Sequence, residues 1–118
     1  MSFRRGDVLI ALFPNADGSP PKPRPVLVVQ ADAYNVKLHN VVVAAITSNL
    51  AHAADPASLL IDVATPAGAA TGLRHDSVVS TINVATISDT LVAKKIGELP
   101  DPLLRQADLC LKTALGLP

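Results

Sequence analysis

The segment Lys22-Pro23-Arg24-Pro25 places an arginine between two prolines. The prolines fix the backbone on both sides of Arg24. A planar guanidinium held in this way suits bidentate binding of a phosphate or a carboxylate. The alternative is that Arg24 only solvates the start of a strand. Arg24 is therefore a candidate anion-binding residue whose role depends on the polar groups around it.

A second polar group follows the apolar run 41–46, where Thr47, Ser48 and Asn49 stand in succession. Functional side chains often project from strand ends at the rim of a barrel. The alternative is that these residues begin an ordinary turn.

The segment 72–77, GLRHDS, brings several ionisable groups together at the start of a strand. Adjacent residues of a strand point to opposite faces, so Arg74, His75 and Asp76 cannot all converge on one substrate. For at least one of them the sequence favours a solvated strand edge.

The remaining histidines and the single cysteine indicate no metal centre. His39 and His52 lie in polar connections, where a solvated position is expected. Cys110 belongs to an apolar helical stripe and is expected in the core. Dispersed histidines with one cysteine lack the spacing of a zinc site. We expect no metal and no cofactor.

Composition limits the class of protein. The 118 residues have a net charge of zero, 49% apolar residues and 17% charged residues. This excludes a disordered tail and a binder of nucleic acid that acts by bulk charge, but not a local basic groove. No apolar run is long enough to span a membrane, and no signal peptide precedes the first strand-like run. We expect a cytoplasmic protein with one domain, 1–118.

The pattern of apolar residues predicts a mainly β fold with a C-terminal helix. The helix is expected to be capped by Asp101 and to end at Gly116. A loop is expected at 15–23, and 66–72 is turn-rich. The strands are expected at 6–14, 25–31, 40–48, 58–64, 77–88 (two short strands or one bent one) and 91–99, the last broken by Gly97. Such short strands favour a small, bent barrel with a packing helix.

Five segments in this order resemble the MazF/PemK family of toxins from type II toxin–antitoxin systems. They are GDVLIALFP at 6–14, KPRPVLVV at 22–29, VVVAAITS at 41–48, GLRHDSVV at 72–79 and KKIGELPDPLL at 94–104. The resemblance implies an SH3-like, CcdB-like β-barrel that forms a homodimer. It also implies a metal-independent endoribonuclease that cuts single-stranded RNA at short sequences and is neutralised by a cognate antitoxin protein.

The resemblance also assigns roles to residues. It implies that Arg24 and Thr47 are catalytic, with supporting roles for His75 and Ser77, although Ser77 is not acidic and is not assigned the role of a base. Ser48, next to Thr47 at the polar strand end, is a further candidate for a supporting role. The position that is often arginine in the family is Ala85 here. The loop before Arg24 is expected to bind RNA or act as a mobile gate, through Asn15, Asp17, Gly18, Ser19 and Lys22.

The chemistry expected of such a site starts from the RNA itself, which carries its nucleophile, the 2′-OH. Arg24 would hold the phosphoryl oxygens and Thr47 would donate a hydrogen bond to them or orient the 2′-OH. The sequence supplies no clear general base, although His75 has the right type of side chain. The products would be a 2′,3′-cyclic phosphate and a free 5′-hydroxyl.

Two other functions fit the same segments. One is a CcdB-like toxin that binds DNA gyrase, and the other is an inactive dimeric binding module. The arginine and the threonine at the strand end favour the nuclease. A homodimer is expected because the runs 25–31 and 40–48 are apolar on both faces, and a chain of this size has too little helix to cover them.

Overall fold

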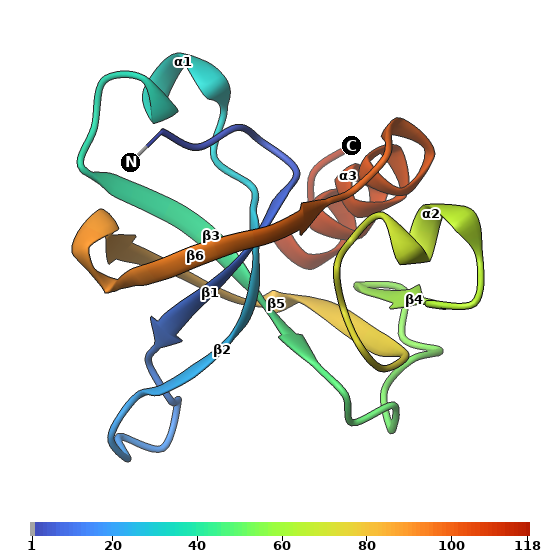
Figure 1. The fold of residues 1–118 in the computed structure, drawn as a ribbon. Helices are drawn as coiled ribbons and strands as arrows, with labels where there is room; N and C mark the ends of the chain where they lie inside the picture. Colours follow the sequence, from blue (N-terminus) through green and yellow to red (C-terminus); the bar gives the residue numbers. More distant parts are fainter. Residues whose placement is uncertain (1) are drawn as a thin grey trace.

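A computed structural model describes residues 2–118 as a strongly curved antiparallel sheet with a C-terminal helix (Figure 1). The strand order is β4-β5-β3-β2-β1-β6. The strands are β1 (Asp7–Phe13), β2 (Lys22–Val28), β3 (Asn40–Thr47), β4 (Ser58–Ile61), β5 (Ser77–Ser88) and β6 (Val92–Glu98). The helices are α1 (Asp32–Asn35), α2 (Pro66–Ala69), the 3₁₀ turn η1 (Asp89–Leu91) and α3 (Asp101–Leu115). The mainly β class with a C-terminal helix is confirmed.

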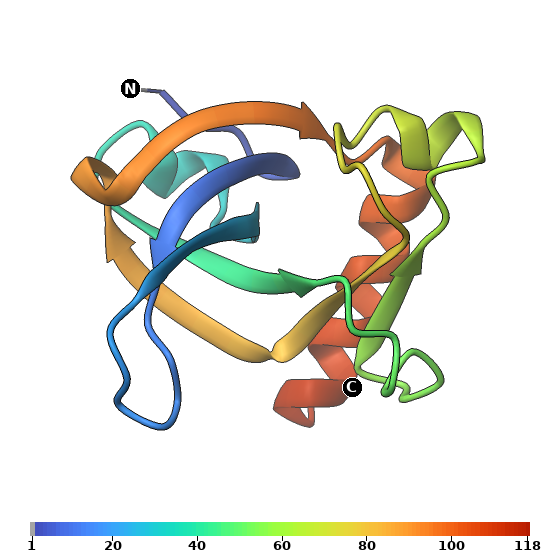
Figure 2. The same ribbon diagram turned by 60° about the horizontal axis from the view of Figure 1, so that its bottom comes forward.

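The sheet curls into a barrel-like shape, and α3 packs against β4 and β5 (Figure 2). One core contains alternate residues of the central strands, such as Val26 and Val43, and lies inside the curl. The other contains the intervening residues, such as Leu27 and Ala44, and packs against α3. Most apolar residues on the two faces of β2 and β3 are therefore buried within one chain. Val29 and Val42, from the two apolar runs, line an open groove beside the end of α3, so the single helix covers these runs incompletely.

Strand β5 is one strand with a sharp bend. Its pairing with β3 jumps from Ala44–Val84 to Ala45–Ser80, so residues 81–83 bulge out of the ladder. Thr81 is buried in the bulge and its hydroxyl donates to the Ala57 carbonyl at 2.6 Å. The bend lets β5 pair with β3 on both sides of the bulge and with β4 at one end.

Strand β2 begins three residues earlier than expected, at Lys22, and ends at Val28. Its first half pairs with β1 alone, since pairing with β3 starts only at Val26. Proline is tolerated in a strand that has a free side, which is why Pro23 and Pro25 lie within β2. After β2 the chain forms α1, which the sequence analysis missed.

Strand β4 and the turn-rich segment 66–72 also differ from expectation. β4 ends at Ile61 rather than at residue 64, because Asp62 accepts a hydrogen bond from the Ala64 amide and starts a turn. The helical turn α2 follows, with Thr65 accepting from the Gly68 amide and Pro66 in its first turn.

β6 is one strand from Val92 to Glu98, but its ladder with β1 shifts register between Lys95 and Gly97, so Gly97 lies next to a bulge and does not end the strand. A Cβ at Gly97 would lie 2.3 Å from the Thr71 carbonyl carbon, and one at Gly72 would lie 1.9 Å from the Ile96 carbonyl oxygen. Gly72 also has a φ of +75°. These two glycines therefore allow the loop before β5 to pack directly on β6.

Helix α3 starts at Asp101, with Pro100 as its N-cap and without a side-chain cap, so the expected cap at Asp101 was wrong. Asp101 instead places a carboxylate in the first turn, where its negative charge interacts favourably with the positive end of the helix dipole. The helix ends at Gly116 as expected, with a φ of 68°. Cys110 is buried, as expected, and burial raises the pKa of its thiol. Within residues 2–118 no helix has the length and apolar character needed to cross a bilayer.

Candidate active site at the loop end of the barrel

Arg24 lies in the first half of β2, opposite Ala11 of β1, and is half-buried. Its guanidinium donates a hydrogen bond to Asn15 Oδ1 at 3.1 Å. No carboxylate among residues 2–118 forms an ion pair with it. The arginine is thus oriented by a neutral amide and keeps donors free for an anion.

The loop before Arg24 is organised by its own short polar side chains. Asn15 Nδ2 donates to the Pro20 carbonyl at 2.8 Å, and Asp17 accepts from the Ser19 amide and hydroxyl. The Ser19 hydrogen bonds lower the pKa of the Asp17 carboxyl. Gly18 turns the chain with a φ of 79°. Of the residues expected to bind or gate, only Asn15 contacts Arg24. Lys22 belongs to β2 and is exposed opposite Phe13.

Thr47 is the last residue of β3 and shares a face of the sheet with Arg24. The β2–β3 ladder pairs Val26 with Ala45, and residues paired across an antiparallel ladder lie on the same face. Two residues further on, the same register sets Arg24 across from Thr47, beyond the last hydrogen-bonded pair. We call this side of β2, β3 and β5, with Arg24, Val26, Ala45 and Thr47, the Thr47 face.

A small cavity of about 120 Å³ lies beside Thr47 on this face. Thr47 pairs with Val78 of β5, and Ser80 lies between Ser58 of β4 and Ala45 of β3. Asn83 Nδ2 donates to Ser80 Oγ at 3.1 Å. The lining is polar apart from one valine and consists of Thr47, Asn49, His52, Ser58, Val78, Ser80 and Asn83.

His52 reaches this cavity from the loop between β3 and β4. The Asn49 amide donates to Thr47 Oγ1 at 3.1 Å, and Asn49 Oδ1 accepts from the Ala51 amide at 3.0 Å. The His52 carbonyl accepts from the Asp55 amide at 3.1 Å. These local bonds fold the loop back toward the end of β3 and hold His52 beside the cavity.

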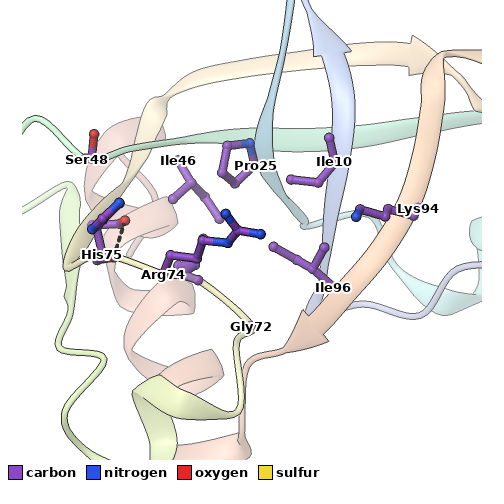
Figure 3. Close-up of a pocket in the computed structure, with 11 residues that line it drawn as sticks. Ile10, Pro25, Ile46, Ser48, Gly72, Arg74, His75, Lys94 and Ile96 are labelled. Atoms are coloured by element: carbon purple, nitrogen blue, oxygen red, sulfur yellow. Dashed lines mark hydrogen bonds between the residues drawn. The ribbon is translucent and has the colours of Figure 1, made fainter.

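Ser48, His75 and Ser77 lie elsewhere, in a cavity of about 390 Å³ on the opposite side of the sheet (Figure 3). Ile46 and Pro25 form part of its wall, and both alternate with residues of the Thr47 face. We call this side the Ser48 face. Ser77 is buried and its hydroxyl donates to the His75 carbonyl at 2.8 Å.

The same cavity contains two more basic side chains. In Figure 3 the Arg74 guanidinium points inward between Pro25 and Ile96, and Lys94 lies at the far edge. The structure thus brings the two expected catalytic residues onto one face and places the three expected supporting residues on the other.

The residues missed by the sequence analysis are His52, Ser58, Ser80 and Asn83. Ser80 and Ser58 are brought to Thr47 by strand pairing, and Asn83 by the bulge in β5. His52 had been interpreted as a solvated loop residue; it is exposed, but it lines the Thr47 cavity. Its spacing of five residues from Thr47 was the one available signal. Among residues 2–118, no cluster of three His, Cys, Asp or Glu side chains has the geometry to hold a metal ion.

The fold and this site define a small barrel with a basic residue and a polar cavity at the end where two loops project. The model of the family described as "PemK-like, MazF-like toxin of type II toxin-antitoxin system" matches residues 4–115. The chain therefore belongs to this family, as its motifs had suggested.

Individual relatives agree with this assignment. The Mycobacterium tuberculosis protein named endoribonuclease MazF6 is 38% identical over 119 residues, covering 99% of this chain and 100% of the relative. The solved structure of the M. tuberculosis toxin MazF-mt6 matches with a TM-score of 0.77 and 28% identity, over 95% of this chain and 98% of that one. A mycobacterial endoribonuclease solved in complex with its cognate antitoxin matches with a TM-score of 0.77 and 22% identity, over 99% and 98% of the two chains.

Proposed function

We propose that this toxin is a metal-independent, sequence-specific endoribonuclease that cuts single-stranded mRNA by attack of the 2′-OH on the adjacent phosphate. The observation that carries the proposal is that the register of β2 and β3 puts Arg24 and Thr47 on one face of the sheet, where Thr47 lines a polar cavity. A relative named endoribonuclease, similar over its whole length, favours RNA cleavage over gyrase binding or an inactive module.

Arg24 binds and stabilises charge in this mechanism. A guanidinium stays protonated at neutral pH, so it holds the non-bridging phosphoryl oxygens rather than accepting a proton. Its hydrogen bond to Asn15 fixes one edge of the group before substrate arrives. Charge that develops on phosphorus therefore meets a donor that is already oriented, which is the arrangement that lowers a barrier.

Thr47 supplies a second, uncharged contact. Its Oγ1 accepts from the Asn49 amide, so the hydroxyl proton is available to donate to a phosphoryl oxygen or to the 2′-oxygen. Thr47 is half-buried at the cavity mouth, where a bound nucleotide excludes water. Arg24 and Thr47 together orient the phosphodiester without a metal ion.

A cognate antitoxin is the second partner that we propose. The mycobacterial endoribonuclease solved with its antitoxin shares this fold. A segment that covers the Thr47 face would compete with RNA for Arg24, and an acidic or amphipathic segment would do so best. Inhibition by occupation needs no rearrangement of Thr47.

We propose that the active form is a homodimer acting in the cytoplasm, where its mRNA substrate is found. Large apolar side chains are exposed along the end of α3, at Leu109, Leu115 and Leu117. A surface of this kind is typical of a contact between chains. Light scattering at micromolar concentration tests the dimer, and a monomer mass would contradict it.

The deciding experiment for RNA cleavage uses the purified protein, a long RNA and EDTA, with mapping of the cut ends. We expect cuts at a short recurring sequence, with 5′-hydroxyl ends that polynucleotide kinase labels without prior dephosphorylation. DNA of the same sequence, which lacks the 2′-OH, is the control and should remain intact. Cleavage that requires added Mg²⁺, or cleavage of the DNA, would contradict the mechanism.

A further inference from the structure

The chain has three histidines, and the structure separates them. His39 is 94% exposed and its ring lies 3.3 Å from Asp89 at the far end of β3. His75 lies in the cavity of the Ser48 face. Only His52 lines the cavity that contains Thr47.

Apart from His52, no side chain that lines the Thr47 cavity can accept a proton at neutral pH. Arg24 is permanently charged, and a threonine hydroxyl is too weak a base at neutral pH. The other polar side chains of the cavity are two amides and two hydroxyls: Asn49, Asn83, Ser58 and Ser80. Attack by a 2′-OH is slow unless its proton is removed as the oxygen approaches phosphorus.

We propose that His52 is the general base of the cleavage reaction, a role that rests on the proposed RNA cleavage at Arg24 and Thr47. A neutral imidazole nitrogen of His52 takes the 2′-OH proton while the 2′-oxygen forms a bond to phosphorus. The bond from phosphorus to the 5′-oxygen breaks, and that oxygen takes a proton from water. The imidazolium then returns its proton to the solvent, so protons and charge balance over the cycle.

The surroundings of His52 suit this role. Its ring forms no hydrogen bond or ion pair with any of residues 2–118, so both nitrogens are free for substrate. No lining residue from β3, β4 or β5 is titratable or charged. The one acid near it on its own loop is Asp55, whose Oδ1 accepts from the Ala57 amide at 2.8 Å.

The test measures single-turnover cleavage in EDTA between pH 5 and pH 9, on an RNA oligonucleotide that carries one mapped cut site. The variants are His52→Gln, His75→Gln and, as matched control, His39→Gln. Because a general base must be unprotonated to accept the 2′-OH proton, the wild-type rate should rise with pH until the base is fully deprotonated. His52→Gln should lose roughly 10²- to 10⁴-fold in rate, together with this rise.

Two further measurements separate proton transfer from binding. The same oligonucleotide with a 2′-deoxy sugar at the cut site should bind His52→Gln and wild type equally. Added imidazole should restore part of the cleavage to His52→Ala, in which the side chain leaves space. His39→Gln should match wild type in rate and pH profile.

A His52→Gln variant that keeps the wild-type rate and pH profile overturns the proposal, and so does a loss confined to His75→Gln. Either outcome would overturn only the role of His52. The proposed function, RNA cleavage at Arg24 and Thr47, would still stand if the Arg24→Ala variant is inactive on the same oligonucleotide. A wild-type protein that cuts no RNA defeats the proposed function itself, so the two failures are distinguishable.

Discussion

Replacement of Arg24 by alanine tests the centre of the proposed site. The side chain donates to Asn15 and is otherwise free to bind an anion. We expect Arg24→Ala to slow RNA cleavage by roughly 10²- to 10³-fold while the protein stays folded. The physical reason is that a preorganised charged donor is lost from the position where negative charge develops.

The two consequences of this change differ in size. Loss of one donor of this kind from an active site costs about 2.7–4 kcal/mol of barrier, or roughly 10²- to 10³-fold in rate. Loss of the single hydrogen bond to Asn15, at the surface of the barrel, should cost no more than about 1 kcal/mol of folding free energy. Activity should therefore fall by orders of magnitude with little change in stability.

The assay compares single-turnover cleavage in EDTA with urea unfolding of the same preparations. Arg74→Ala is the matched control, because it removes the same charge from the Ser48 face. Its cleavage rate should stay within about threefold of wild type, a difference of less than 1 kcal/mol in the barrier. The reasoning is refuted if Arg24→Ala cuts within that margin, or if Arg74→Ala loses as much as Arg24→Ala.

Three further outcomes follow from the structure. Thr47→Val, which keeps the side-chain volume, should slow cleavage at least about tenfold, since a donor to the phosphate is lost, and a full-rate variant removes Thr47 from the mechanism. Gly72→Ala should lower the free energy of unfolding by at least about 2 kcal/mol, because the new Cβ would clash with the Ile96 carbonyl and because φ is positive at this residue. Urea unfolding measures this change, and a change under about 0.5 kcal/mol contradicts the prediction. The hydrogen bond to Asp7 raises the pKa of Lys95 above its ordinary value of 10.5. The contribution of the Lys95–Asp7 pair to the free energy of unfolding is therefore complete below pH 10.5 and is lost as the pH rises through the folded-state pKa. Measurements of unfolding free energy against pH should show this alkaline loss in wild type and not in Lys95→Met.

The sequence predicted elements well where apolar periodicity dominates. The observed bounds differ by a residue or so from the expected ones for β1, β3, β5 and α3. Each of these elements is buried on at least one side, and burial requires the regular spacing of apolar residues from which the element was predicted. The start of β2 was missed because its prolines are tolerated on the half of the strand that pairs with β1 alone. Whether a proline is tolerated depends on which strands pair with β2 at that residue, and the local sequence does not reveal that pairing.

The fold around Gly97 shows a second limit of the same kind. A glycine in a strand pattern indicates either an interruption or a close approach of another segment. The sequence analysis expected an interruption, whereas the loop at Thr71 and Gly72 packs against an unbroken β6. Only knowledge of that distant loop distinguishes the two outcomes.

The candidate residues lie on two opposite faces of the sheet, because successive residues of a strand alternate between faces. The sequence motifs therefore contained only some of the residues that surround Thr47. Thr47 and Ser48 are adjacent in sequence, so a strand must send them to opposite faces. His75 and Ser77 lie with Ser48, whereas Ser80 and His52 reach Thr47 through the β5 ladder and a folded loop. A motif that is contiguous in sequence therefore contributes to two surfaces, and the one proposed to be catalytic is completed by residues from other segments. For a β-barrel of this kind, the residues most worth mutating are those paired across the ladder from Thr47, not those beside it in the chain.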